Sequence, residues 1–154
     1  MAIRNFWCVL LEDPSRLEAC RSGEDHVHRA FSESLRRDGA IVYEDRRTNI
    51  ETEWHGRTIP PDTDIMISLG SANADDEVFA NPETFDPDRT DLLFGTERKY
   101  GIRENGVGGH MAFGLGSHFC MGYQLARAEV VAATTNLLLD LPSPRLRAPQ
   151  EFRI

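Results

Sequence analysis

A single cysteine between a glycine-rich run and the start of a helix constrains this chain more than any other feature of its sequence. The segment HMAFGLGSHFCMGYQLARAEV, residues 110–130, holds Cys120 among Gly114, Gly116 and Gly122. The first N–H groups of a helix have no partners within it, so a group just before the helix is favoured as an anion. We therefore expect thiolate character at Cys120. The glycines let the backbone approach something bulky and flat.

An electron-rich thiolate in such a loop suits a nucleophile, a metal ligand or a haem ligand. A nucleophile needs a base within reach, and His118, two residues before Cys120 in an extended loop, is expected to point away. Zinc needs more soft ligands than Cys120, His118 and His110 supply, and their spacing matches no known zinc pattern. A buried structural cysteine is the remaining interpretation, and the glycine framing counts against it. From the residues alone these alternatives stay open.

Length and charge limit the class of protein. The chain has 154 residues, a net charge of −8 and a pI of about 5.1, which fits one domain over residues 1–154 and argues against a general nucleic-acid binder. Its three cysteines are widely spaced, which fits a reducing cytoplasm rather than a disulfide framework. The early apolar run FWCVLL is too short to span a membrane, and no signal peptide or lipidation motif is apparent. We expect a cytoplasmic protein with no nucleic-acid or membrane partner.

Hydrophobic periodicity predicts a mainly α chain with a small β component. Helices are expected over residues 1–12, 13–21 and 24–39, the second capped by Asp13 with Pro14 at its first position. Short strands are expected within residues 40–54 and 57–70, joined by a turn at residues 55–56 and followed by a short helix or turn at 71–82. A long helix after Cys120 is expected to bury one apolar face, formed by Ala126, Val130, Ala133 and Leu137.

The cysteine loop resembles the haem-binding loop of the cytochrome P-450 family. That pattern is Phe, two residues, Gly, one residue, His or Arg, one residue, Cys, one residue, Gly. FGLGSHFCMG fills every fixed position, with Phe113, Gly116, His118, Cys120 and Gly122.

Two upstream motifs extend the resemblance to nearly the whole chain. ESLR fills the family's Glu-x-x-Arg pattern with Glu33 and Arg36, which share one face of a helix and can form a buried ion pair. FDPDR, residues 85–89, resembles the later loop whose arginine joins that pair, here Arg89. The three motifs occur in the same order as in the family, and the chain resembles the soluble bacterial members of that family.

The resemblance implies the C-terminal part of the α-rich cytochrome P-450 fold, with haem b (iron protoporphyrin IX) as cofactor and Cys120 as the axial ligand of the haem iron. His118 and Arg46 would bind the haem propionates, with Arg47 as the rival of Arg46. Phe113 would limit water near the thiolate, and His110 would lie close to the haem edge. The cofactor-binding set is thus Cys120, His118, Arg46, Phe113, Gly114, Gly122 and His110, whereas Glu33, Arg36 and Arg89 are structural.

The implied activity is that of a haem-thiolate monooxygenase. Such an enzyme inserts one oxygen atom of O2 into a small organic substrate, with electrons from a ferredoxin or a similar donor. Residues 1–14 resemble only the tail of the family's distal helix, and its acid–alcohol pair is missing from this sequence. The alternative is therefore a truncated, catalytically incomplete haem-binding fragment with no monooxygenase activity of its own.

The segment between Arg89 and His110 is longer than in most bacterial members. It holds a small basic cluster in an acidic protein, at Arg98, Lys99 and Arg103. The family's geometry would place this cluster near the proximal surface. We expect it to contribute to docking of an acidic electron donor.

Overall fold

The computed structural model describes residues 1–93 and 108–146. The elements follow in the order α1 (Ala2–Glu12), α2 (Pro14–Cys20), α3 (Glu24–Arg37), β1 (Tyr43–Arg47), β2 (Thr52–Trp54), β3 (Arg57–Ile59), β4 (Asp64–Ser68), α4 (Leu69–Asn73), the 3-10 turn η2 (Gly116–His118) and α5 (Tyr123–Asp140). The expectation of a mainly α chain with a small β component is confirmed. The basic cluster at Arg98, Lys99 and Arg103 lies outside the described residues.

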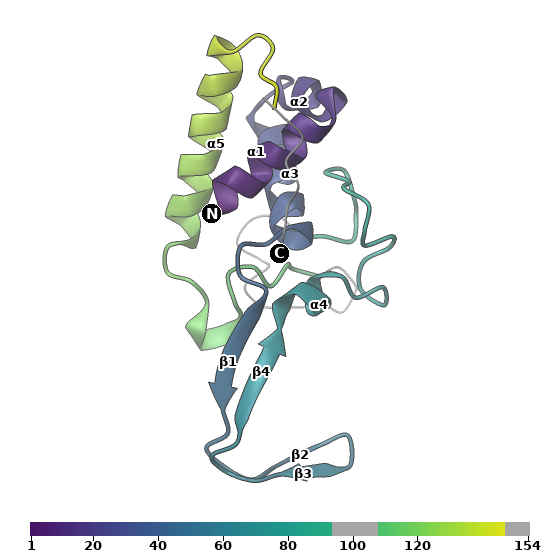
Figure 1. The fold of residues 1–154 in the computed structure, drawn as a ribbon, viewed down its shortest axis with the longest axis vertical. Helices are drawn as coiled ribbons and strands as arrows, with labels where there is room; N and C mark the ends of the chain where they lie inside the picture. The colour runs from purple at the N-terminus through teal and green to yellow at the C-terminus, as the bar shows by residue number, and fades with distance from the viewer. Residues whose placement is uncertain (94–107, 147–154) are drawn as a thin grey trace.

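Figure 1 shows the helices gathered at one end and the strands extending away from them. Among the described residues, no helix is long and apolar enough to cross a membrane.

Helix α3 is the centre of the helical part, because it contacts α1, α2, α4 and α5. Its side chains Val27, Ala30, Phe31 and Leu35 recur at helical spacing, and each is at most 4% exposed. Phe31 packs edge-to-face on Phe6 of α1, with ring centroids 5.4 Å apart. The apolar face predicted from the sequence is therefore the one that α3 buries.

The boundary between α1 and α2 is set by two adjacent residues. Asp13 is extended and its side-chain oxygen accepts a hydrogen bond from the N–H of Ser15, at 2.9 Å. Pro14 begins α2, where its missing N–H costs nothing. Both predictions for this boundary are confirmed.

Helix α5 lies along α3, but the face it buries differs from the predicted one. Val130 is buried as expected, whereas Leu137 is 40% exposed. The buried side chains of α5 are Tyr123, Val130, Val131, Thr134 and Leu138. The prediction was wrong here because apolar residues surround this helix on all sides, and periodicity alone does not choose among them.

The C-terminal end of α5 is held by an arginine that follows α2. The guanidinium of Arg21 donates to the carbonyl oxygen of Leu138 and, at 2.6 Å, to that of Leu141. The last carbonyls of a helix have no partners within it and carry its negative dipole end, so a buttressing cation there is favourable. This contact ties the end of α5 to the α2–α3 connection.

The strands form two antiparallel pairs, β1 with β4 and β2 with β3. The predicted turn at His55 and Gly56 closes β2–β3 with positive φ values of 50° and 72°, which suit a tight hairpin. Strand β4 ends two residues earlier than expected, because Ser68 caps α4 by accepting from the N–H of Ser71 at 3.2 Å.

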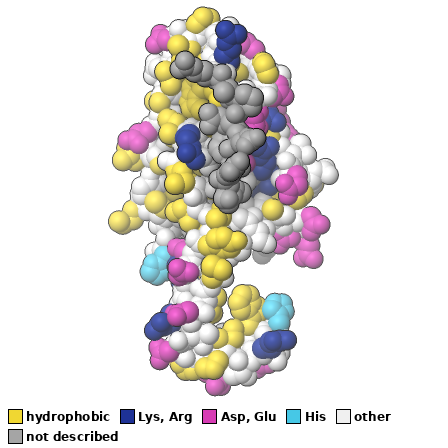
Figure 2. All heavy atoms as spheres, viewed as in Figure 1, with side chains coloured by type: hydrophobic (Ala, Val, Ile, Leu, Met, Phe, Trp, Pro, Cys, Tyr) yellow, Lys and Arg dark blue, Asp and Glu magenta, His cyan; other side chains and the backbone are white. Residues whose placement is uncertain are grey.

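Figure 2 shows the paired strands as a narrow arm below a broader helical body, with hydrophobic side chains exposed on both parts. Pairing in the arm sets Glu44 opposite Ile67, Arg46 opposite Ile65, and Arg47 opposite Asp64. Directly opposed residues share a face and successive residues alternate, so Glu44 and Arg46 lie on one face of the β1–β4 ribbon and Arg47 on the other.

Candidate functional site

The loop before α5 holds Cys120 in a fixed backbone conformation. Gly114 and Gly116 have φ values of 74° and 66°, a region that side chains disfavour. The turn of η2 follows, and the N–H of Cys120 then donates to the carbonyl of Phe113 at 2.9 Å. This hydrogen bond joins the two ends of the loop from Phe113 to Cys120. Cys120 itself is exposed, two residues before the N-cap of α5 at Gly122.

Aromatic rings support the loop from within. The ring of Phe113 lies edge-on to that of Tyr123, with centroids 5.0 Å apart, and Phe119 meets Tyr123 in the same way at 5.2 Å. Tyr123 is only 3% exposed. A side chain at Gly122 would have its Cβ 3.7 Å from the sulfur of Cys120, an ordinary contact distance. The aromatic cluster therefore anchors the loop on the first turn of α5 and leaves the thiol accessible.

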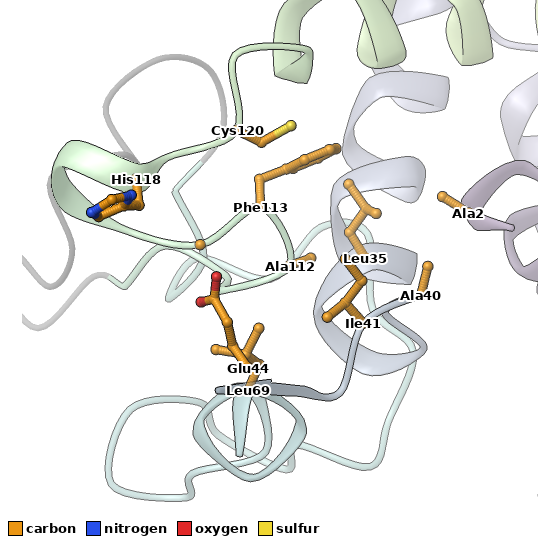
Figure 3. Close-up of a pocket in the computed structure, with 11 residues that line it drawn as sticks. Ala2, Leu35, Ala40, Ile41, Glu44, Leu69, Ala112, Phe113, His118 and Cys120 are labelled. Carbon is orange, nitrogen blue, oxygen red and sulfur yellow. The ribbon is translucent and has the colours of Figure 1, made fainter. Parts of the chain in front are cut away.

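The thiol borders an apolar pocket of about 260 Å³. Figure 3 shows Phe113 beside Cys120, with Leu35 of α3 and Ala2 of α1 facing the same space. The connection from α3 to β1 adds Ala40 and Ile41 to the lining. Closed small-molecule sites usually measure about 300–1,000 Å³, so this pocket suits one wall of a site for a larger group.

His118 and the thiol lie on different sides of the loop. Figure 3 shows the imidazole of His118 directed away from Leu35 and Ala2, although it borders the pocket. This agrees with the orientation expected from its position two residues before Cys120, so His118 is not placed to act as a base for the thiol. Among the described residues, no three His, Cys, Asp or Glu side chains come together as a metal site of their own.

The structure distinguishes the two rival arginines of β1. Arg46 lies on the face of Glu44, and its Nη2 is 2.8 Å from the carboxylate of Glu44, which borders the pocket. A Cβ at Gly114 would be 3.9 Å from that carboxylate, so this face of β1 lies against the cysteine loop. Arg47 lies on the opposite face, with its Nε 2.8 Å from Asp64. Arg46 is therefore the arginine beside the site.

His110 is buried behind the loop, with 2% of its surface exposed. Its Nδ1 accepts from the N–H of Ala112 at 3.3 Å, and its ring centroid is 6.1 Å from that of Phe113. These contacts place His110 next to Phe113, which lines the pocket. Its expected position close to a haem edge stays a prediction.

The structure brings Glu33, Arg36 and Arg89 together in the interior. Arg36 donates to both carboxylate oxygens of Glu33 at 2.8 Å, and both side chains are fully buried. Arg89 Nε lies 3.3 Å from Glu33 Oε2. Two arginines and one glutamate leave one positive charge, and Asp91 balances it by accepting from Arg89 at 3.0 Å.

Sequence reasoning missed three residues that complete this cluster and its surroundings. Asp91 supplies the fourth charge. The ring of Phe79 lies 5.3 Å and 5.7 Å from the guanidinium carbons of Arg36 and Arg89. Asn73 accepts from Arg36 through its main-chain carbonyl at 2.8 Å. Nothing in the local pattern marks Phe79 or Asn73, whereas the position of Asp91 two residues after Arg89 was a usable signal.

Comparison with known proteins identifies the family. The model of the cytochrome P-450 family matches residues 27–141. A steroid C26-monooxygenase of Mycobacterium tuberculosis is 34% identical over 145 residues, which is 94% of this chain and 32% of the relative. A cytochrome P-450 of Bacillus subtilis is 32% identical over 150 residues, 97% of this chain and 33% of the relative.

A solved structure gives the same result for the fold. The crystal structure of P450BioI in complex with hexadec-9Z-enoic acid ligated acyl carrier protein superposes with a TM-score of 0.79 and 31% identity, over 96% of this chain and 34% of that one. The chain belongs to the cytochrome P-450 family. It spans about a third of the length of the curated relatives it matches. Members of the family bind haem b, held by a cysteine thiolate.

Proposed function

We propose that this chain carries the haem-thiolate site of a cytochrome P-450 monooxygenase, with residues 1–154 forming one domain. The observation that carries the proposal is the exposed thiol of Cys120, fixed by its N–H bond to Phe113 and bordering an apolar pocket. One exposed soft ligand on an apolar wall, with His118 on its lining and Arg46 held beside it by Glu44, fits a flat apolar group that carries carboxylates and a metal.

Different residues would bind different parts of this cofactor. Cys120 would supply the axial thiolate, and Phe113 beside it would keep water from the sulfur. Arg46 and His118 would bind the propionates, after Arg46 exchanges its partner Glu44 for a propionate. When bound, haem supplies the oxygen chemistry, and a thiolate ligand favours O–O cleavage. The substrate would be a small organic molecule, and the electrons would come from a ferredoxin or a similar donor.

The spectrum of the reduced carbon monoxide complex tests this assignment. Haem is added to the purified chain, reduced and exposed to carbon monoxide. We expect a strongly red-shifted Soret band that disappears in Cys120→Ser, because only a thiolate ligand produces that shift. Cys8→Ser is the matched control, since Cys8 is a free thiol in α1 and is not among the residues that line the pocket beside Cys120. A red-shifted band that persists in Cys120→Ser would refute the role of Cys120.

The two arginines of β1 provide a second test. We expect Arg46→Gln to weaken haem binding about 5- to 10-fold, the loss of roughly 1–1.4 kcal/mol for a charge-assisted contact at a partly exposed site. Arg47→Gln removes the same charge from the opposite face of β1 and should leave the haem dissociation constant within about twofold. Titration of haem into each variant, followed by absorbance, measures both. Equal losses would show that the effect is only that of net charge.

A specific observation favours a second function. Ile41 lines the pocket and Val42 follows it in the chain, yet they are 56% and 48% exposed, so the described residues leave apolar surface beside the site in contact with water. On this alternative the chain binds haem but has no monooxygenase activity of its own. A thiolate spectrum without any substrate oxidation by the 154-residue chain, supplied with a ferredoxin and its reductase, would favour it.

We also propose a cytoplasmic location, supported by the presence of three free cysteines.

A further inference from the structure

Asn73 joins two parts of the molecule that are far apart in the sequence. It is the last residue of α4 and is only 2% exposed. Its main-chain carbonyl accepts from Nη1 of Arg36 at 2.8 Å, and its side-chain oxygen Oδ1 accepts from the N–H of Met111 at 2.6 Å. One buried residue thus contacts both the ion cluster of α3 and the segment that leads into the cysteine loop.

The side of this link toward α3 is rigid. Arg36 is fully buried and is held by both oxygens of Glu33, and it also donates to the carbonyl of Pro82 at 2.6 Å. A guanidinium with a fixed plane and several charge-assisted hydrogen bonds has little freedom to move. The carbonyl of Asn73 is therefore attached to a fixed point in the core.

The side toward Cys120 is a short series of backbone hydrogen bonds. The carbonyl of Met111 accepts from the N–H of Gly114, and the carbonyl of Phe113 accepts from the N–H of Cys120, each at 2.9 Å. Asn73 Oδ1 fixes the N–H of the same Met111 whose carbonyl opens this series. A single side chain, that of Asn73, thus connects the start of the loop to a residue whose main chain binds the ion cluster.

We propose that Asn73 is a positioning residue, which fixes the loop of Cys120 relative to the buried cluster of Glu33 and Arg36. The proposal rests on the proposed function, since it concerns the placement of the ligand thiol. The chemistry requires a side-chain acceptor at residue 73, because a partly buried N–H left without a partner is costly and the loop would move to find one. A main-chain carbonyl alone holds α4 to Arg36 but leaves the loop untethered.

Two substitutions at this position separate the acceptor from the shape of the side chain. Asn73→Leu keeps the branching and the number of side-chain heavy atoms and has no acceptor, whereas Asn73→Asp keeps an oxygen in place of Oδ1. Val9→Ala is the matched control for stability, because Val9 is 3% exposed in α1 and lies outside this series of hydrogen bonds. Each variant of the 154-residue chain is compared by amide exchange and by the spectrum of its reduced, carbon monoxide-treated haem complex.

We expect the Met111 amide to exchange about 10-fold faster in Asn73→Leu than in the wild type. We also expect the fraction of the variant's reduced carbon monoxide complex that shows the red-shifted Soret band to fall at least about threefold. Asn73→Asp should stay near the wild type in both, and Val9→Ala should change neither beyond the effect of its lower stability. A result in which Asn73→Leu behaves like Val9→Ala would overturn the proposal.

The failure of the proposed function is distinguishable from the failure of this inference. If the wild-type chain gives no red-shifted band, Cys120 is not shown to be a haem ligand, and the amide data decide the role of Asn73 alone. Faster exchange at Met111, Gly114 and Cys120 in Asn73→Leu, restored by Asn73→Asp, then supports positioning of the loop. Unchanged exchange at these three amides contradicts it.

Discussion

Replacement of Glu33 by glutamine is expected to lower the free energy of unfolding by about 3–5 kcal/mol, because it leaves Arg36 and Arg89 as buried charges without their shared carboxylate. This loss is comparable with the whole stability of a small domain, roughly 5–15 kcal/mol. Urea unfolding followed by circular dichroism measures it. A variant that is already unfolded without urea would show that the loss is at least as large as the whole stability of the wild-type chain.

The chain contains its own control for this experiment. Glu18 and Arg21 have the same spacing as Glu33 and Arg36, and their ion pair measures 3.1 Å, but the side chain of Glu18 is 68% exposed. Exposed pairs contribute about 0–1 kcal/mol, so Glu18→Gln should lower the free energy of unfolding by less than about 1 kcal/mol. Similar losses in the two variants would mean that burial does not decide the contribution of Glu33.

The second large effect concerns pH. Burial raises the pKa of the Cys20 thiol to about 12, from an ordinary value of 9.0. The folded chain keeps this thiol neutral, whereas the unfolded chain loses the proton near pH 9. The stabilisation is therefore complete below about pH 9 and is lost as the pH rises toward 12, by about 1.4 kcal/mol per pH unit. We expect the free energy of unfolding to fall steeply between pH 9 and 10.5.

A variant without the thiol checks the origin of that slope. Cys20→Ala should be less stable at pH 7, because it removes buried volume, but its free energy of unfolding should fall less steeply between pH 9 and 10.5. Leu17→Ala, a buried change in the same helix, should lose stability and keep the slope of the wild type. An unchanged slope in Cys20→Ala would assign the alkaline sensitivity to other groups.

The elements of the fold were predictable where one local signal was enough. Asp13 and Pro14 marked the start of α2, and the apolar spacing of Val27, Phe31 and Leu35 gave the buried face of α3. Helix α5 had no such signal, because its apolar residues are spread around the helix and Thr134 takes a fully buried place. Its buried face is set by what α3 presents to it, which is a property of the tertiary structure.

In the candidate site, too, some contacts were predictable from the sequence and others were not. The spacing of Glu33 and Arg36 on one helix predicted their contact, and the motif around Cys120 predicted a loop before a long helix, which is α5. Asn73 was not predictable, since its two hydrogen bonds reach residues 37 and 38 positions away in the sequence. Contacts of this kind depend on how α3, α4 and the loop pack together, and a short motif does not encode them.

Successive residues of β1 face opposite sides of the β1–β4 ribbon, so the effect of an insertion in β1 depends on whether it adds an odd or an even number of residues. One residue inserted between Glu44 and Arg46 would turn Arg46 outward and bring Arg47 to the face of Glu44. Two inserted residues would keep Arg46 on its present face, although farther along the arm. We therefore expect insertions in β1 to be tolerated better in even steps, because an odd step replaces Arg46 with Arg47 on the face that borders the site.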